Sequence, residues 1–442
     1  MGTVNKKELN IEKISAKKTF SDKEREIEEI LSSHKTKIKV IGCGGAGNNT
    51  LTRLLDSGIS EVVSIAVNTD AQDLLYAQAD QKILIGREIT NGLGAGSNPE
   101  IGEHAAHESE EEISSHLTGA DLIFVTCGLG GGTGTGSAPV IAEIAKKDNA
   151  LTIAVVSLPF TEEGVMRWDN AQAGLEKLRE NTDTVIIVQN DRLLEIAPDM
   201  PLNQAFKVAD EILANAVKGI TELVTEKGLV NLDFADIRAV MKNGGTAMIG
   251  LGESSSEDKA RESVDIAVKN PLLDVDIAGA KSALINITGG SDMSLKDARV
   301  IMKSIAERLD PSARVIWGAR MDPNLENTLR VMLIVTGLVS DGKRIAYRTH
   351  AEKQMTDTNA APNRFGADDT ETVTTVMHVH GSEQTHEKKD STRNSQHVFN
   401  KIFEEEAGVD IEILQEAAKA LQVGLNSHTP LRDIKNASNS IN

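Results

Sequence analysis

The sequence is poor in aromatic residues, in cysteine and in long apolar runs. Only 3% of the 442 residues are aromatic, which disfavours the stacking platforms used to bind single-stranded nucleic acids. Two cysteines cannot supply a disulfide framework. No apolar run reaches the roughly 18 residues of a membrane-spanning helix, and the charged first 31 residues lack the apolar core of a signal peptide. We therefore expect a soluble, cytoplasmic protein.

Positive charge is also scarce. The chain has 47 lysine and arginine residues against 66 aspartate and glutamate residues, for a formal net charge of -19. This balance repels nucleic acid and anionic membrane surfaces, so neither is an expected partner. The length is sufficient for two domains with extensions.

Short apolar patterns typical of strands alternate with helical patterns in the first half of the chain. We expect strands at residues 37–41, 62–67, 82–85, 122–126, 151–157 and 184–188. Such alternation predicts a doubly wound, Rossmann-like parallel α/β sheet. Ligands of these sheets bind at the carboxyl ends of the strands.

A long amphipathic helix is expected at residues 203–227, where apolar residues recur every three or four positions. About 25 residues would span roughly 37 Å, enough to connect two domains. Beyond it, helices are expected at 236–242, 257–269 and 295–308, and strands at 282–288, 314–317 and 328–336.

These patterns predict six segments. They are a charged extension (1–36), a doubly wound domain (37–202), a central helix with its connection (203–230), a smaller α+β domain (231–340), a disordered linker (341–397) and a tail (398–442). An apolar stripe in the tail predicts a short amphipathic helix, which either binds a partner or packs on the main body.

The strand at 122–126 leads into a run of glycine and threonine, GGGTGTG, at residues 130–136. A helix is expected to follow, with Ser137 as its N-cap and Pro139 in its first turn. Open backbone N–H groups, threonine hydroxyls and the positive end of a helix together suit a phosphate group. A flexible loop is the alternative interpretation.

Two more glycine-rich loops, at residues 42–47 and 91–99, also precede helices. The first satisfies G-x-G-x-x-G, and Asp70 ends the next strand where a ribose-binding acid would lie, so an NAD-dependent oxidoreductase is an alternative. The loop at 130–136 has no role in a dinucleotide-binding unit. Three loops at one sheet edge instead predict an oligophosphate held by backbone amides, without a P-loop lysine.

The sequence also resembles a known family. Residues 130–136 resemble the tubulin signature, and further motifs lie at 44–48, 68–70, 159–160 and 231–236. Together they resemble the FtsZ family of tubulin-like prokaryotic cell-division GTPases over about residues 37–338. The charged extension and the lack of a recognisable bacterial-type C-terminal peptide resemble archaeal members.

The resemblance implies that GTP or GDP is bound, with Mg²⁺ accompanying the nucleotide. The residues implied around the phosphates and the neighbouring ribose are Gly44, Gly45, Ala46, Gly47, Asn48, Asp70, Ala95, Gly96, Ser97, Gly131, Gly132, Thr133, Gly134 and Thr135. Glu163 and Arg167 would hold the ribose and a nearby phosphate, although a structural salt bridge is the alternative for Glu163. No metal site made of protein ligands is expected.

Three further residues are implied at the guanine base. Asn190 and Asp210 would read its polar edge, because a carboxylate can accept hydrogen bonds from both the N1–H and the 2-amino group. Phe206, one helical turn before Asp210, would pack on the base. Ordinary core packing is an alternative for Phe206 that is compatible with this role.

Asn231, Asp233 and Asp236 are the expected catalytic residues. Two acids three positions apart at a helix start can face the same way and orient a water and its cation towards the terminal phosphoryl group. Helix capping by Asp233 is the alternative. The resemblance implies that this loop reaches the nucleotide of the neighbouring subunit, so that hydrolysis requires head-to-tail assembly, a contact that builds open filaments.

We therefore expect GTP-dependent filaments of the mid-cell division ring, with an adaptor protein bound to the tail and no direct membrane insertion. A scaffold that binds GTP but scarcely hydrolyses it is an alternative. Cys43 and Cys127 are expected on neighbouring strands, where modification of the thiols would block nucleotide binding unless they serve only close packing. A histidine tract at 378–386 is expected to be a solvated polar segment rather than a metal site.

Overall fold

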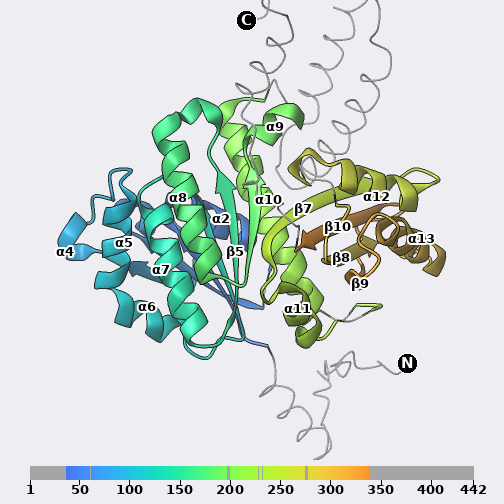
Figure 1. The fold of residues 1–442 in the computed structure, drawn as a ribbon, viewed down its shortest axis with the longest axis horizontal. Helices are drawn as coiled ribbons and strands as arrows, with labels where there is room; N and C mark the ends of the chain where they lie inside the picture. Colours follow the sequence, from blue (N-terminus) through green and yellow to red (C-terminus); the bar gives the residue numbers. More distant parts are fainter. Residues whose placement is uncertain are drawn as a thin grey trace, which may run out of the picture.

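The computed structural model describes residues 36–59, 61–196, 200–226, 228–230, 232–273 and 277–337. The predicted N-terminal extension, linker, tail helix and histidine tract lie outside these ranges. In the described part of the chain, one sheet of ten strands runs through the molecule in the order β3-β2-β1-β4-β5-β6-β7-β10-β8-β9 (Figure 1). The strands are β1 (Ile38–Cys43), β2 (Val62–Asn68), β3 (Gln81–Leu84), β4 (Leu122–Gly128), β5 (Leu151–Leu158), β6 (Thr184–Gln189), β7 (Gly245–Ser254), β8 (Ser282–Gly289), β9 (Arg314–Met321) and β10 (Leu329–Thr336).

The first six strands pair in parallel, which confirms the doubly wound sheet predicted from the alternating pattern. All eight residues of β5 are buried, as expected for a parallel strand covered on both faces. On β1, Ile38 and Val40 pack into one core, whereas Ile41 and Cys43 pack into the other, so the strand contributes to both faces.

Helices cover both faces of the sheet (Figure 1). The cores place α5–α8, α12 and α13 on one face, and α2, α10 and α11 on the other. The helices are α2 (Gly44–Asp56), α3 (Ala71–Tyr76), α4 (Arg87–Thr90), α5 (Pro99–Glu108), α6 (Glu110–Leu117), α7 (Thr133–Lys147), α8 (Val165–Asn181), α9 (Asp191–Ile196), α10 (Leu202–Thr225), α11 (Phe234–Met241), α12 (Lys259–Lys269) and α13 (Leu295–Ala306), with 3₁₀ turns at Thr161–Glu163 and Pro271–Leu273.

The central helix α10 has 24 residues, close to the predicted extent. Its apolar residues at three- and four-residue spacing, from Ala205 through Leu213 to Leu223, are buried against the sheet. Burial of each large side chain stabilises the fold by about 1.5–3 kcal/mol. Neither α10 nor any other helix of the described residues has the length and apolar composition needed to cross a bilayer.

The second half of the sheet has mixed direction. β10 lies between β7 and β8 and is antiparallel to both, while β8 and β9 are parallel. The apolar pattern did not predict β7, which joins the two halves by pairing with β6. Two of its glycines are required by packing on α12, since a Cβ atom would lie 2.3 Å from the carbonyl oxygen of Ala267 at Gly250 and 2.0 Å from that of Ser263 at Gly252.

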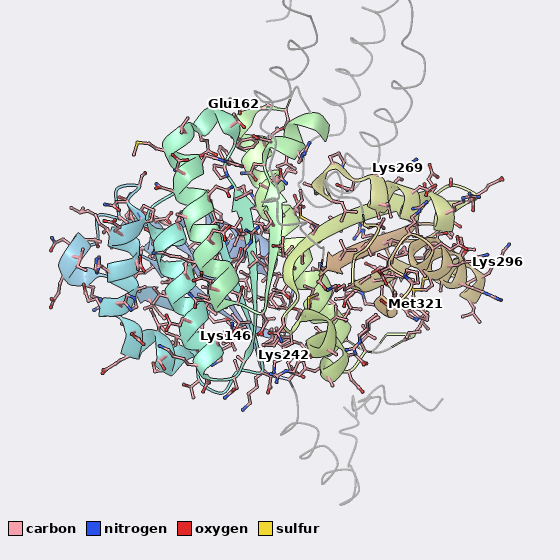
Figure 2. The ribbon with its side chains drawn as sticks, viewed as in Figure 1. Lys146, Glu162, Lys242, Lys269, Lys296 and Met321 are labelled. Carbon is pink, nitrogen blue, oxygen red and sulfur yellow. The ribbon has the colours of Figure 1, made fainter. Side chains whose placement is uncertain are left out.

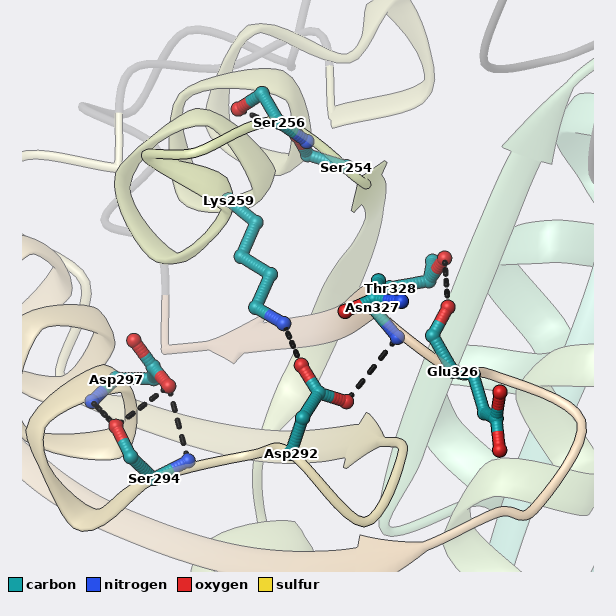
Figure 3. A network of polar contacts seen from close by, with 9 residues as sticks. All are labelled: Ser254, Ser256, Lys259, Asp292, Ser294, Asp297, Glu326, Asn327 and Thr328. Atoms are coloured by element: carbon teal, nitrogen blue, oxygen red, sulfur yellow. Dashed lines mark hydrogen bonds and ion pairs between the residues drawn. The ribbon is translucent and has the colours of Figure 1, made fainter.

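A polar network fastens the loops at the far end of this half (Figure 3). Lys259, the first residue of α12, forms an ion pair with Asp292, whose carboxylate also accepts a hydrogen bond from the backbone N–H of Asn327 at 3.1 Å. Ser294 caps α13, because its hydroxyl accepts a hydrogen bond from the backbone N–H of Asp297 at 3.2 Å; the same hydroxyl donates to the Asp297 carboxylate at 2.6 Å. These contacts tie the loop after β8 to the loop between β9 and β10.

Candidate functional site

A cavity of about 290 Å³ lies at the carboxyl ends of β1, β4, β5 and β6, where parallel sheets bind their ligands. Of the predicted nucleotide-binding residues, those that line it are Gly44, Gly45, Ala46, Ser97, Gly131, Gly132, Thr133, Gly134, Glu163, Arg167, Asn190, Phe206 and Asp210. Gly47, Asn48, Asp70, Ala95, Gly96 and Thr135 do not line the cavity. Residues from across the first half of the chain therefore converge on one concave site.

The loop between β4 and α7 forms one wall. Gly130 has a φ of 102°, and its N–H donates to the hydroxyl of Thr135 at 2.8 Å, so Thr135 holds the loop from behind. A Cβ atom at Gly131, in contrast, would meet nothing within 4 Å. Gly131 lines the cavity, and no packing contact within the protein requires a glycine there.

The helix after this loop begins earlier than expected. α7 starts at Thr133 with Gly132 in the N-cap position, so the prediction that Ser137 is the N-cap was wrong. The hydroxyl of Ser137 instead donates to the carbonyl of Thr133 at 2.7 Å, and Pro139 lies inside the helix. The earlier start brings the first turn of α7 to the cavity wall, where its unpaired N–H groups suit an anion.

The loop after β1 forms a second wall, and α2 begins at Gly44. Gly47 serves packing, because a Cβ atom there would lie 2.4 Å from the carbonyl oxygen of Thr126 on β4. Asn48 is 2% exposed, and neither polar atom of its side chain has a hydrogen-bond partner. Two helix N-termini, those of α2 and α7, thus meet at the cavity and supply positive potential without any lysine.

The third glycine-rich loop approaches from the side of α5. Ser97 lines the cavity and has a φ of 61°. Ala95 is buried, and a Cβ atom added at Gly132 would lie 2.9 Å from the Cβ atom of Ala95. Ala95 therefore supports the Gly132 loop from behind. Asp70 caps α3, accepting from the N–H groups of Gln72 and Asp73 at 2.9 and 3.0 Å.

Glu163 and Arg167 form an ion pair with each other at the cavity rim. The salt bridge that was the alternative for Glu163 is therefore present, and both side chains still line the cavity. The backbone N–H of Phe160 donates to the Glu163 carboxylate at 2.9 Å and fixes its position.

Asn190, which follows β6, and Phe206 and Asp210 on α10 also line the cavity. Phe206 is 40% exposed and makes an edge-to-face contact with Phe160 at 5.3 Å between ring centroids, so its ring is only partly engaged in the core and offers surface to the cavity. Burial raises the pKa of Asp210 to about 7, against the lowering effects of Arg53 and a hydrogen bond from Thr50. A ligand that donates hydrogen bonds to this carboxylate would restore its charged form.

The expected catalytic acids lie elsewhere. Asp233 is the N-cap residue of α11, and its N–H donates to the carboxylate of Asp236 at 3.3 Å; Asn231 lies outside the described residues. Neither acid lines the cavity. Figure 2 labels Glu162, beside the cavity-lining Glu163, at the top of the view and Lys242 at the bottom; Lys242 follows the carboxyl end of α11, and the two acids lie at the other end of that helix.

Cys43 and Cys127 are directly opposed on the neighbouring strands β1 and β4, as predicted. Both are buried, and burial raises the pKa of each thiol, that of Cys127 to about 12. Neutral, enclosed thiols react slowly, so these contacts favour the packing interpretation. A Cβ atom added at Gly134 would lie 3.2 Å from the Cβ atom of Cys127, so the start of α7 packs closely on this pair.

Several cavity residues were not assigned from sequence. They are Cys43, Gly128, Leu129, Ser157, Pro159 and Ala209. Ser157 and Pro159 lie at the carboxyl end of β5, and the rule that ligands bind at such ends could have identified them. Among the described residues, no group of three histidine, cysteine, aspartate or glutamate side chains is placed to hold a metal ion.

Both halves of the described chain match known protein families. The sequence model of the Tubulin/FtsZ family GTPase domain matches residues 37–198, and that of the FtsZ family C-terminal domain matches residues 245–339. Cell division protein FtsZ 1 of Methanocaldococcus jannaschii is 58% identical over 321 residues, which are 73% of this chain and 88% of the relative. Cell division protein FtsZ of Haloferax mediterranei is 55% identical over 335 residues, 75% and 89% of the two chains.

Solved structures show the same fold. An empty FtsZ dimer from M. jannaschii, 58% identical, has a TM-score of 0.69 and covers 73% of this chain and 94% of its own. A GTPγS-bound protofilament of CetZ2 from Haloferax volcanii has a TM-score of 0.62 and covers 73% and 99%. At 23% identity, that second structure supports the fold alone.

Proposed function

Because this chain belongs to the tubulin/FtsZ family, we propose that it polymerises head to tail into filaments of the cell-division ring and completes GTP hydrolysis at the contact between subunits. The family itself implies guanine-nucleotide binding and GTPase activity and makes the oxidoreductase alternative untenable. Assembly into filaments, and the dependence of hydrolysis on assembly, are what we propose beyond the family assignment.

The observation that carries the proposal is the separation of the cavity from the two acids. Asp210 lines the cavity near the start of α10, and Thr225 ends the helix shortly before Asp233 and Asp236. A rise of 1.5 Å per residue places Thr225 about 22 Å along the axis from Asp210. Neither acid lines the cavity of its own subunit, and in the proposed head-to-tail filament they face the nucleotide of the next.

In the proposed complex the three glycine loops hold the phosphates, Glu163 and Arg167 hold the ribose and a phosphate, and Asn190, Phe206 and Asp210 hold the base. Mg²⁺ accompanies the phosphates, since this ion is commonly bound through substrate oxygens and water rather than by a protein cage. It supplies charge neutralisation at the phosphoryl group.

Hydrolysis then requires an oriented water. Asp233 and Asp236 of the neighbouring subunit hold the water and accept its proton as its oxygen attacks the terminal phosphorus. The bond from that phosphorus to the bridging oxygen breaks, which leaves GDP and inorganic phosphate. The capping contact between Asp233 and Asp236 fixes the acids relative to each other at the start of α11.

The test combines dilution with mixing. We expect the GTPase rate per molecule to be near zero in dilute solution and to rise above a threshold concentration. We also expect Asp236→Asn, which keeps the cavity, and Asp210→Ala, which keeps the acids, to be inactive alone and to recover turnover when mixed. A rate independent of concentration, or a mixture without recovery, would exclude hydrolysis at the subunit contact. A chain without turnover at any concentration would instead be a GTP-binding scaffold.

The division site also requires an anchor. We propose that the protein acts in the cytoplasm at mid-cell and that an adaptor protein binds residues 398–442, since the acidic chain does not favour direct membrane binding. Deletion of these residues is expected to abolish localisation to the division site while leaving GTPase activity intact. Localisation that survives the deletion would contradict the adaptor.

A further inference from the structure

The carboxyl-terminal end of α10 carries an unusual charge arrangement. Glu222 lies in the last turn and Glu226 directly follows the helix, whereas the last turn contains no basic residue. Carboxylates near the negative end of a helix are unfavourable, and like charges four positions apart repel each other. A positive charge beyond that of Lys218, which lies one turn before Glu222 and also lowers its pKa, is therefore favourable at this end.

Arg320, on the edge strand β9, supplies that charge. Its Nη2 lies 3.1 Å from Oε2 of Glu222, and its Nη1 lies 2.6 Å from Oε2 of Glu226. The Glu222 side chain is 10% exposed and that of Glu226 is 46% exposed. Burial raises the pKa of Glu222, and Arg320 opposes this rise most strongly. One guanidinium thus bridges both carboxylates, which a lysine ammonium does less well.

The same strand also holds the chain that follows α10. The N–H groups of Leu229 and Val230 both donate to the carbonyl oxygen of Ala319, at 2.8 and 3.2 Å, and the N–H of Ala319 donates to the carbonyl of Val230 at 3.2 Å. Residues 228–230 are therefore fastened to β9 immediately before the loop that carries the two acids. Two consecutive residues of β9 therefore hold this part of the chain: the Arg320 side chain holds the end of α10, and the Ala319 backbone holds the residues that follow it.

We propose that Arg320 is a positioning residue for GTP hydrolysis: by bridging Glu222 and Glu226 it holds the end of α10 against β9 and so fixes where Asp233 and Asp236 stand at the subunit contact. This inference rests on the proposed hydrolysis between subunits. Arg320 contacts neither the nucleotide cavity nor the acids. Its removal leaves two repelling carboxylates at the helix end and weakens the hold of β9 on residues 228–230, which precede the acids.

Arg330, on β10, two strands from β9 in the sheet, offers a matched control. Arg330 on β10 pairs through Nε with Glu253 of β7 at 2.8 Å, and its register partner is that same residue. Arg320 and Arg330 both line a second cavity between α10 and the sheet. The Arg330 pair therefore matches the Arg320 pairs in chemistry and location, but it links two strands and touches neither carboxylate of α10.

The experiment compares Arg320→Gln with Arg330→Gln in the full-length chain. Three quantities are measured: GTP affinity in dilute solution, amide hydrogen exchange of residues 228–236, and GTP turnover per sedimented subunit. For Arg320→Gln we expect unchanged affinity, about tenfold faster exchange at Leu229 and Val230, and turnover lowered about 10- to 100-fold. We expect Arg330→Gln to leave all three unchanged, and Arg320→Lys to give intermediate turnover.

Two further measurements keep the result decisive. Arg320→Lys keeps a positive charge beside the two carboxylates but loses the two-armed bridge, so its lowered turnover tests the positioning role even if Arg320→Gln fails to fold. Turnover per sedimented subunit that is equal in Arg320→Gln and Arg330→Gln, or GTP affinity that falls in parallel with turnover, would overturn the positioning role. The dilution series of the unaltered chain tests hydrolysis between subunits separately, so failure of the proposed function is distinguishable from failure of this inference.

Discussion

Nucleotide affinity should depend on pH through a single buried carboxylate. Asp210 lines the cavity with its pKa raised to about 7, chiefly by burial. In the proposed complex the carboxylate accepts hydrogen bonds from the guanine N1–H and 2-amino groups, so only its deprotonated form binds well. Because binding favours the charged form, the pKa falls in the complex and a proton is released. Affinity is therefore gained as pH rises through 7 and lost as it falls below.

The magnitude follows from the titration. With a pKa of about 7, about one molecule in eleven is deprotonated at pH 6, against about ten in eleven at pH 8. The apparent affinity should therefore fall about tenfold between pH 8 and pH 6, which corresponds to about 1.4 kcal/mol. At pH 7, binding should release about half a proton per nucleotide.

The measurement is equilibrium binding of GDP to the dilute chain, with calorimetry in buffers of different ionisation enthalpy to count released protons. The terminal phosphate of the nucleotide also titrates near pH 6, so Asp210→Asn serves as the control, because it keeps the phosphate and removes the carboxylate. The ratio of the two affinities isolates Asp210. A ratio that stays constant between pH 6 and pH 8 would refute the role given to this carboxylate.

Two contrasts test the phosphate loop. Gly136→Ala would place a Cβ atom 2.0 Å from the carbonyl oxygen of Pro99 and should lower the free energy of unfolding by about 3 kcal/mol or more. Gly131→Ala should change the free energy of unfolding by less than about 0.5 kcal/mol and weaken GTP binding. Denaturant titration and binding measurements check both variants, and a stable Gly136→Ala would contradict the close packing. Thr135→Val removes the acceptor of the Gly130 N–H and should lower the free energy of unfolding by about 1–3 kcal/mol. Thr135→Ser keeps the hydroxyl and should retain most of the stability. Equal losses in both variants would show that the hydroxyl is not responsible.

Much of the fold was predictable because its signals are local. Buried parallel strands appear as short apolar runs, and α10 appears as an apolar stripe at helical spacing, so the strands and the central helix were found close to their observed ends. The tubulin/FtsZ fold and family, predicted from the motifs, are confirmed by the family models and relatives. The assigned roles of individual site residues stay predictions.

The failures occur where local rules compete with packing. β7 was missed because Gly245, Gly250 and Gly252 weaken a strand pattern, yet Gly250 and Gly252 are needed for α12 to approach. Ser137 is a good N-cap in isolation, but α7 begins at Thr133 because the glycine loop turns there and packs on β1, where a Cβ atom at Gly134 would lie 2.9 Å from the carbonyl oxygen of Cys43.

The sequence by itself determined the alternation of strands and helices, the three glycine loops and the pair of acids at the start of α11, since each depends on neighbours in the chain. Only the tertiary structure decided which loops share one cavity and how far the acids stand from it. The charge at the end of α10 is balanced by Arg320, a residue 94 positions beyond Glu226. Contacts of this kind are set by the order of strands in the sheet, and no local pattern records them.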